Sequence, residues 1–100
     1  MAVLPPRFEY SGVKTSDALL KTGAGYVHTV NISQADAAPS AGTIQIRDAV
    51  AAGGGTVIWE WNLTTAVFVP FTVTLDCHFN DGLYVDFTTT ADVNVQVSFK

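Results

Sequence analysis

The sequence DVNVQVSFK, residues 92–100, has the clearest structural signature in the chain. Its apolar residues occupy every second position, and polar residues lie between them. Side chains alternate between the two faces of a β-strand, so a period of two places all the apolar side chains on one face. The pattern predicts a strand with one buried face, formed by Val93, Val95, Val97 and Phe99.

Other runs upstream of this strand are also rich in β-branched and aromatic residues, which favour strands. They cover residues 26–33, 43–48, 56–63, 67–76 and 83–88. Segments that contain Gly, Pro, Asn and Asp separate them, as turns require. Six or seven strands at this spacing predict an all-β fold, an antiparallel sandwich or barrel. The length of 100 residues suits one such domain, which we assign to residues 10–100.

Three local features refine this prediction. The Asp81-Gly82 step is typical of a tight hairpin turn. Pro70 has no amide hydrogen, so the run around it should be an edge strand, a bulged strand, or a strand bent between two sheets. The segment Val13–Leu20 contains too few good helix formers to predict a helix.

The N-terminal residues 1–9 are predicted to form an extended arm outside the core. Pro5-Pro6 restricts the backbone there to extended conformations. Such an arm could clasp a neighbouring subunit, or it could be a disordered tail.

The segment LLKTGAGYVHTVNI, residues 19–32, places a lysine beside a Gly-Ala-Gly sequence. A phosphate-binding loop needs such glycines between a strand and the N-terminus of a helix. Here an alternating strand pattern follows the glycines instead. The segment therefore predicts a turn before a strand.

The composition favours assembly and disfavours several partners. Only 14% of the residues are charged, against about 25% in ordinary soluble domains, and the mean hydropathy is +0.27. A small domain of this kind is expected to cover part of its surface with a partner. The formal charge is −4 and no basic run occurs, so nucleic acid is not an expected partner. We also expect no signal peptide, no membrane span and, with Cys77 as the one cysteine, no internal disulfide.

Trp59 and Trp61 lie on the same face of a predicted strand, and Glu60 lies on the other. If that face were exposed, the two rings could stack on sugars, as in a carbohydrate-binding module. The interpretation that we favour is a bulky core or subunit contact.

His28, His78, Cys77, Asp76 and Asp81 are the candidates for a metal site. On a strand Cys77 and His78 point to opposite faces, and no recognised ligand spacing occurs, so we predict no metal site. No motif brings a nucleophile, a histidine and an acid together, so we predict no catalytic residues, no cofactor and no enzymatic activity.

Three segments carry a resemblance to a known group of proteins. They are SGVKTSDALLKTGAGYVHTVNIS (11–33), AGTIQIRDAVAAGGGTVIWEWNL (41–63) and FTVTLDCHFNDGLYVDFTTTADVNVQVSFK (71–100). From about residue 10 to residue 100 the chain resembles the small virion proteins of tailed bacteriophages, of the capsid decoration or cement type. The resemblance implies a compact β-sandwich or jelly-roll unit, often trimeric, that binds the outer surface of the major capsid protein lattice.

The expected function is therefore that of a non-enzymatic phage structural protein, made in the host bacterial cytoplasm and located on the capsid surface of the virion. As a decoration protein it would stabilise the head. The alternatives are a tail or head-completion component, and a carbohydrate-binding module that uses the two tryptophans. The residues expected at a capsid or subunit interface are Val3, Leu4, Pro5, Pro6, Phe8, Trp59 and Trp61.

Overall fold

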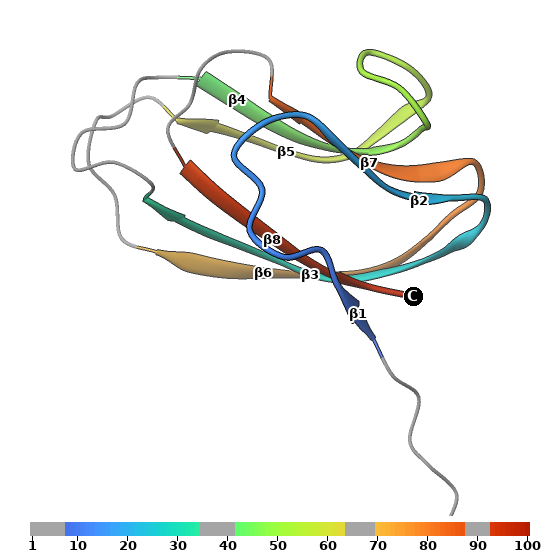
Figure 1. Cartoon of the computed structure of the whole chain (residues 1–100), viewed down its shortest axis with the longest axis horizontal. Helices are drawn as coiled ribbons and strands as arrows, with labels where there is room; N and C mark the ends of the chain where they lie inside the picture. Colours follow the sequence, from blue (N-terminus) through green and yellow to red (C-terminus); the bar gives the residue numbers. More distant parts are fainter. Residues whose placement is uncertain (1–7, 35–41, 64–69, 88–92) are drawn as a thin grey trace, which may run out of the picture.

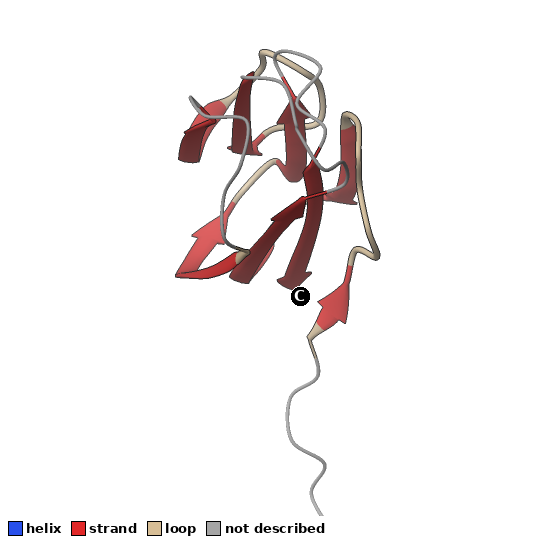
Figure 2. Cartoon of the chain, turned by 90° about the vertical axis from the view of Figure 1, so that its left-hand side faces the viewer, coloured by secondary structure: helices blue, strands red, loops and turns tan. Residues whose placement is uncertain are grey.

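A computed structural model describes residues 8–34, 42–63, 70–87 and 93–100. The regular elements of these residues are all β-strands (Figures 1 and 2). They are β1 (Glu9–Tyr10), β2 (Ala18–Thr22), β3 (Gly25–Gln34), β4 (Gly42–Asp48), β5 (Thr56–Leu63), β6 (Phe71–Phe79), β7 (Gly82–Phe87) and β8 (Val93–Phe99). The described part of the chain has no helix of the length and apolarity that would let it cross a membrane.

The strands form two four-stranded antiparallel sheets that pack face to face (Figure 1). The first sheet has the order β1-β8-β3-β6, and the second has the order β2-β7-β4-β5. The pairs β1/β8, β2/β7, β3/β6 and β4/β5 are those of one long antiparallel ribbon that folds back between β4 and β5. Wrapping this ribbon on itself adds the pairs β8/β3 and β7/β4. This is the strand order of a jelly roll, so the predicted antiparallel sandwich of jelly-roll type is confirmed.

The core lies between the sheets and is built by the period-two pattern. The four apolar residues of β8 that the sequence predicted to be buried are all buried. The polar residues between them lie on the outer face of the first sheet, where Gln96 is exposed. The buried core consists of Val27, Val30, Ile32, Ile44, Ile46, Phe79, Leu83, Val85, Val93, Val95, Val97 and Phe99.

The sequence prediction differs from the structure at three strands. β1 has only two residues and was not predicted. β6 runs from Phe71 to Phe79 rather than from residue 67 to 76; residues 67–69 are outside the described part. Pro70 immediately precedes β6, which is an edge strand of the first sheet, and the missing amide hydrogen explains why the strand begins after it. β2 was not predicted, because a β-bulge between Leu19 and Lys21 interrupts its alternation.

Two tight connections meet at one end of the sandwich. The Gly-Ala-Gly segment forms the connection between β2 and β3, so the predicted turn before a strand is confirmed. Asn80 and Asp81 form the tight connection before β7, but it joins the two sheets, so the predicted hairpin pairing was wrong. The amide of Gly23 donates to the carbonyl of Asp81 at 2.9 Å, which ties the two connections together. Gly23 has a φ of +90°, a conformation that glycine adopts without strain.

The N-terminal segment joins the first sheet at residue 8. The predicted arm covered residues 1–9, of which residues 1–7 lie outside the described part. Phe8 contacts the outer face of the first sheet, and Glu9 begins β1 opposite Phe99 of β8.

Candidate functional site on the outer face of the first sheet

A β-bulge shapes the outer face of the first sheet. Val27 pairs with Cys77, and Thr29 pairs with Thr74, so His28 of β3 lies opposite two residues of β6. Asp76 lies in this bulge with a φ of +46°, which is uncommon for a residue with a side chain. Bulges of this kind re-aim side chains and are frequent beside functional sites.

The bulge brings His28 and Asp76 into contact. Nδ1 of His28 lies 2.5 Å from Oδ1 of Asp76, and because a carboxylate only accepts, the imidazole N–H donates. The side chains of His28 and Asp76 are 37% and 46% exposed, so water reaches this pair. The pKa of Asp76 is lowered, and the hydrogen bond from His28 is the largest cause. Burial opposes this shift, but the hydrogen bonds from His28 and Tyr26 together outweigh it.

Aromatic rings surround this pair. The ring of Phe8 stacks on the imidazole of His28, with centroids 4.6 Å apart and planes at 17°. The ring of Tyr26 meets His78 edge to face at 5.1 Å. Nζ of Lys100 lies 5.5 Å from the centroid of the Phe8 ring, within the range of a cation–π interaction. We call these residues the aromatic–histidine cluster: Phe8, Tyr26, His28, Asp76, His78 and Lys100.

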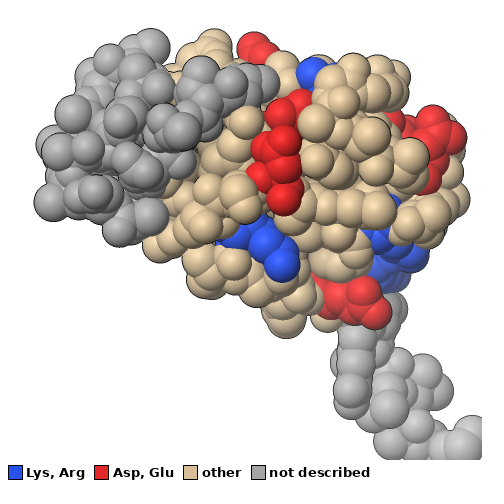
Figure 3. All heavy atoms as spheres, turned by 45° about the horizontal axis from the view of Figure 1, so that its top comes forward, with Lys and Arg blue, Asp and Glu red and all other residues tan. Residues whose placement is uncertain are grey.

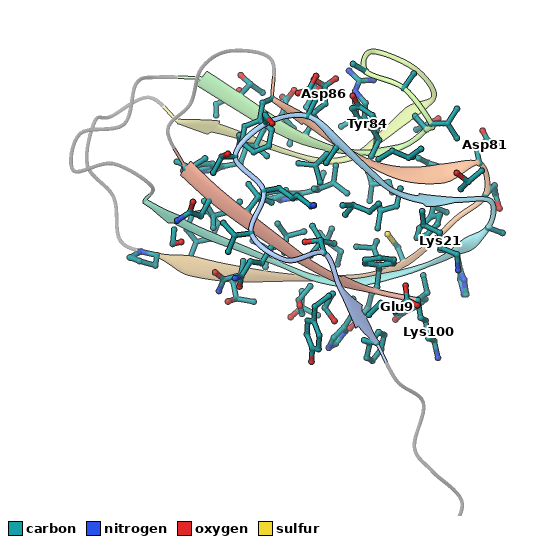
Figure 4. All side chains as sticks on the ribbon, viewed as in Figure 1. Glu9, Lys21, Asp81, Tyr84, Asp86 and Lys100 are labelled. Atoms are coloured by element: carbon teal, nitrogen blue, oxygen red, sulfur yellow. The ribbon has the colours of Figure 1, made fainter. Side chains whose placement is uncertain are left out.

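An open pocket of about 430 Å³ adjoins the cluster, at the end of the sandwich where the two tight connections meet. Figure 4 shows Lys21 and Lys100 at this same end of the molecule. The lining residues, which define what we call the turn pocket, are Lys21, Ala24, Gly25, Tyr26, His78, Phe79, Asn80 and Lys100. Gly25 is required here, because a Cβ at this position would overlap the carbonyl oxygen of Lys100 and the ring of Phe79.

The turn beside the pocket is held by a carboxylate from the second sheet. Asp48, at the end of β4, accepts hydrogen bonds from the amides of Asn80 at 2.9 Å, Asp81 at 2.8 Å and Gly82 at 3.4 Å. Burial alone would raise the pKa of Asp48, but these three hydrogen bonds outweigh it and lower the pKa. Asp48 therefore fixes the turn on which Asn80 is presented to the pocket.

The outer face of the second sheet holds a different charged pair. Nε of Arg47 lies 2.9 Å from Oδ2 of Asp86, and the two side chains are only 13% and 7% exposed. The amide of Gly53 donates to the same carboxylate, and the guanidinium also donates to the carbonyl of Gly54 and to Gln45. The loop after β4 thus covers this pair.

The structure distributes the residues predicted to be functional over several places. Trp59 and Trp61 face inward from β5 and pack against the core, and the ring of Trp61 meets Phe71 edge to face at 5.2 Å. The two rings therefore do not form an exposed pair on which a sugar could stack. Phe8 belongs to the aromatic–histidine cluster, whereas Val3, Leu4, Pro5 and Pro6 lie outside the described residues.

The prediction that Cys77 and His78 point to opposite faces of their strand is confirmed. Cys77 points inward against the core, and His78 is exposed on the outer face. Burial, followed by the nearby carboxylates of Asp76 and Asp48, raises the pKa of the Cys77 thiol. Among the residues that the structure describes, no group of three potential ligands gathers around one point.

The sequence analysis missed the pairing of His28 with Asp76. A signal was present, because the buried residues Val27 and Val30 are three positions apart, whereas the next pair, Val30 and Ile32, is two apart. Such a break in the alternation indicates a bulge. It does not identify the partner residue, which is 48 positions away.

Comparison of the chain with protein-family models, with curated proteins and with solved structures found no match. On the face shown in Figure 3, the acidic and basic side chains of the described residues form small separate groups rather than one extended patch.

Proposed function

We propose that this protein is a non-enzymatic structural protein of a tailed bacteriophage. It acts as a capsid decoration protein that binds the outer surface of the major capsid protein lattice and stabilises the head. The eight-stranded jelly roll supports this proposal, because viral capsid domains use this architecture. The architecture also occurs in proteins of other functions, so the proposal depends on surface features of this chain as well.

One side of the sandwich carries these surface features. We call it the lateral strip and define it as residues 8–19, which include β1, the start of β2 and the segment between them. β1 and β2 are edge strands of the two sheets, and Figure 1 shows the connecting segment crossing from one sheet to the other. Large apolar side chains are exposed along the lateral strip, at Tyr10 (80%), Val13 and Leu19.

The backbone of the lateral strip is held firmly in place. The amide of Ser11 donates to the carbonyl of Val97, and Lys14 forms a two-way bridge with Val95. Asp17 accepts a hydrogen bond from the amide of Phe87 at 2.6 Å. An ordered backbone that presents exposed apolar side chains binds a partner at low entropic cost. Repetition of such a weak contact over a lattice, and within a trimer, gives strong attachment.

The test is co-sedimentation with empty heads of the phage that encodes the protein. Replacing the three exposed apolar residues of the lateral strip with serine is expected to weaken binding at least tenfold. The matched control replaces Val50 and Val57, which are exposed on the second sheet side, and should bind as the original does. Equal binding by both variants would contradict the proposed surface, and no binding of the original protein to heads would contradict the function.

The oligomeric state is a separate part of the proposal. Light scattering during size-exclusion chromatography is expected to give the mass of a trimer of the 10.6 kDa chain. Removal of residues 1–7 should reduce trimer formation or head binding, because these residues directly precede the lateral strip in the sequence. A monomer would argue against a trimeric clamp and in favour of the tail or head-completion alternative, for which binding to isolated tails is the assay.

The carbohydrate-binding alternative loses its original basis, because Trp59 and Trp61 pack against the core. The expected tryptophan emission is blue-shifted and insensitive to added oligosaccharides. A shift on sugar addition would revive the alternative.

A further inference from the structure

The turn pocket is lined by positively charged side chains, although the protein as a whole is acidic. Both charged residues that line it, Lys21 and Lys100, are cations, although the chain as a whole carries −4. In the described part of the chain, neither ammonium group forms an ion pair with a carboxylate. The pocket is therefore lined by two lysines that form no ion pair with a carboxylate side chain among the described residues, and the ammonium group of Lys100 contacts only the edge of the cluster, at the ring of Phe8.

Two of the carboxylates near the pocket are already engaged in hydrogen bonds elsewhere. Asp76 accepts from His28, and Asp48 accepts from the amides of the tight turn. Glu9 and Asp81 are exposed near the pocket but do not line it, and Figure 4 shows both at this end of the molecule. A negatively charged ligand that enters the pocket can therefore pair with the ammonium groups of Lys21 and Lys100.

The backbone donors around the pocket are engaged as well. The amide of Tyr26 donates to the carbonyl of Lys100 at 2.6 Å, and the amide of Gly23 donates to Asp81. Phosphate sites depend on several free backbone amides at a helix N-terminus or in a concave turn, and this pocket does not offer that set. The available donors are the two ammonium groups and the side chains of Asn80 and His78.

The remaining wall is apolar. It includes the methyl group of Ala24 and the ring of Tyr26, whereas Phe79, which also lines the pocket, belongs to the buried core. Pockets of this size, with an apolar wall and a few converging polar groups, bind small molecules or single side chains. A carboxylate fits the two ammonium groups, and an apolar body joined to it fits the ring of Tyr26.

We propose that the turn pocket binds a carboxylate group that is joined to an apolar body. The carboxylate contacts the ammonium groups of Lys21 and Lys100, and the apolar body packs on Tyr26 and Ala24. The ligand is either a free organic acid or an acidic side chain with apolar neighbours on a partner protein. This binding goes beyond the proposed function and does not depend on it, since it is measured on the isolated protein.

The test is a titration with sodium benzoate followed by amide NMR shifts of the full chain at pH 7.5 and constant ionic strength. Saturable shifts are expected at Ala24, Gly25, Tyr26 and Asn80. Benzyl alcohol, which has the ring without the charge, and inorganic phosphate, which has the charge without the ring, should each bind at least tenfold more weakly. Shifts that stay linear and spread over the surface, or equal binding of phosphate, would overturn the proposal.

Charge-removing variants locate the site. Lys21→Met and Lys100→Met should each weaken benzoate binding at least fivefold, whereas Lys14→Met, beside β8 and outside the pocket lining, should not change it. Equal effects of all three substitutions would assign the binding to general charge and overturn the proposal. The unperturbed amide spectra of the variants away from the pocket report that they are folded.

A blocked dipeptide, acetyl-Phe-Glu-amide, distinguishes the two sources of the carboxylate. Binding of this peptide more tightly than benzoate would support an acidic segment of a partner protein as the ligand. Tighter binding of benzoate would support a free organic acid. Failure of both to bind would overturn the carboxylate proposal and leave the head-binding test of the proposed function unaffected.

Discussion

Each sheet carries on its outer face a nitrogen donor paired with a carboxylate, and the two pairs lie in different surroundings. Arg47 and Asp86 on the second sheet are 13% and 7% exposed, whereas His28 and Asp76 on the first sheet are 37% and 46% exposed. Each pair joins a cationic or protonatable nitrogen to a carboxylate at hydrogen-bond distance. The surroundings, rather than the pair, therefore decide what each contributes.

The loop between β4 and β5 supplies further hydrogen bonds to Arg47 and Asp86, which we call the enclosed pair. Gly53 and Gly54 supply a donor to Asp86 and an acceptor to Arg47, so the pair and the loop hold each other. His28 and Asp76, which we call the open pair, contact an aromatic ring instead, because Phe8 stacks on His28. The second sheet's outer face is therefore closed by its own loop, whereas the polar groups of the first sheet's outer face stay accessible to water.

The largest expected effect comes from breaking the enclosed pair. Asp86→Asn keeps the shape of the side chain but leaves the buried guanidinium of Arg47 without its counter-charge. Removing one partner of a buried pair costs about 3–5 kcal/mol of the free energy of unfolding. Urea denaturation measures this loss. A loss below about 1 kcal/mol would contradict the structural role of the pair.

The matched control for this variant is Glu60→Gln on the same outer face. Glu60 is exposed and accepts a hydrogen bond from Gln45 at 2.6 Å. Surface substitutions of this kind change stability by no more than about 0.5 kcal/mol. A large effect of this control would mean that burial does not separate the two kinds of polar contact.

The loop that covers the enclosed pair provides the second prediction. Gly55 has a φ of +59°, and a Cβ there would overlap the carbonyl oxygen of Asp48. Gly55→Ala is expected to cost about 2–4 kcal/mol, because the left-handed conformation and the overlap both oppose it. The matched control is Gly23→Ala at the open end, where φ is +90° and nothing lies near the added Cβ.

The glycine pair separates conformation from overlap. Gly23→Ala should cost only about 1–2 kcal/mol, which is the conformational part alone. Thermal unfolding of both variants is the measurement. Equal losses would show that the overlap at Gly55 is relieved by a small shift of the loop.

The third prediction concerns Asp48, a carboxylate of the second sheet that holds the turn at the end of the first sheet. Asp48 of the second sheet holds the turn beside the turn pocket through three amide hydrogen bonds. Asp48→Ala leaves these amides without their partner and is expected to cost about 1–3 kcal/mol. Hydrogen exchange at Asn80 and Asp81 should accelerate in this variant. Unchanged exchange there would mean that the turn does not depend on Asp48.

Much of the fold could be predicted from the sequence, for a definite physical reason. β5 spans the residues that the sequence predicted, and β4 and β8 agree to within one residue at each end. The reason is that apolar residues at every second position show which side chains of a strand are buried. β2 was missed, since the bulge beside Leu20 interrupts that period. The strand order could not be read from alternation, because the period fixes the buried face of a strand and not its neighbour.

The candidate site was harder to predict than the fold. Lys21 lies in β2 and Lys100 directly follows β8, and the two line one pocket only because the jelly roll brings these parts of the chain to one end of the sandwich. Asp76 reaches His28 through the register of β6 on β3 and through the bulge between them. The inward direction of the two tryptophans likewise depends on the pairing of β5 with the buried residues of β4.

The smallest expected effect comes from the open pair, and it depends on pH. The pKa of Asp76 in the folded protein lies below its ordinary value of 3.8, mainly because of the hydrogen bond from His28. A lowered pKa stabilises the folded state at a pH above that ordinary value, and this contribution is lost as the pH falls through the folded pKa. Asp76→Asn removes the contribution, so this variant should be less stable than the original protein at pH 5, and the difference should shrink between pH 4 and pH 2. Urea midpoints across this range measure it, with Asp81→Asn as the exposed control, and a difference that stays constant with pH would show that His28 does not stabilise the charged form of Asp76.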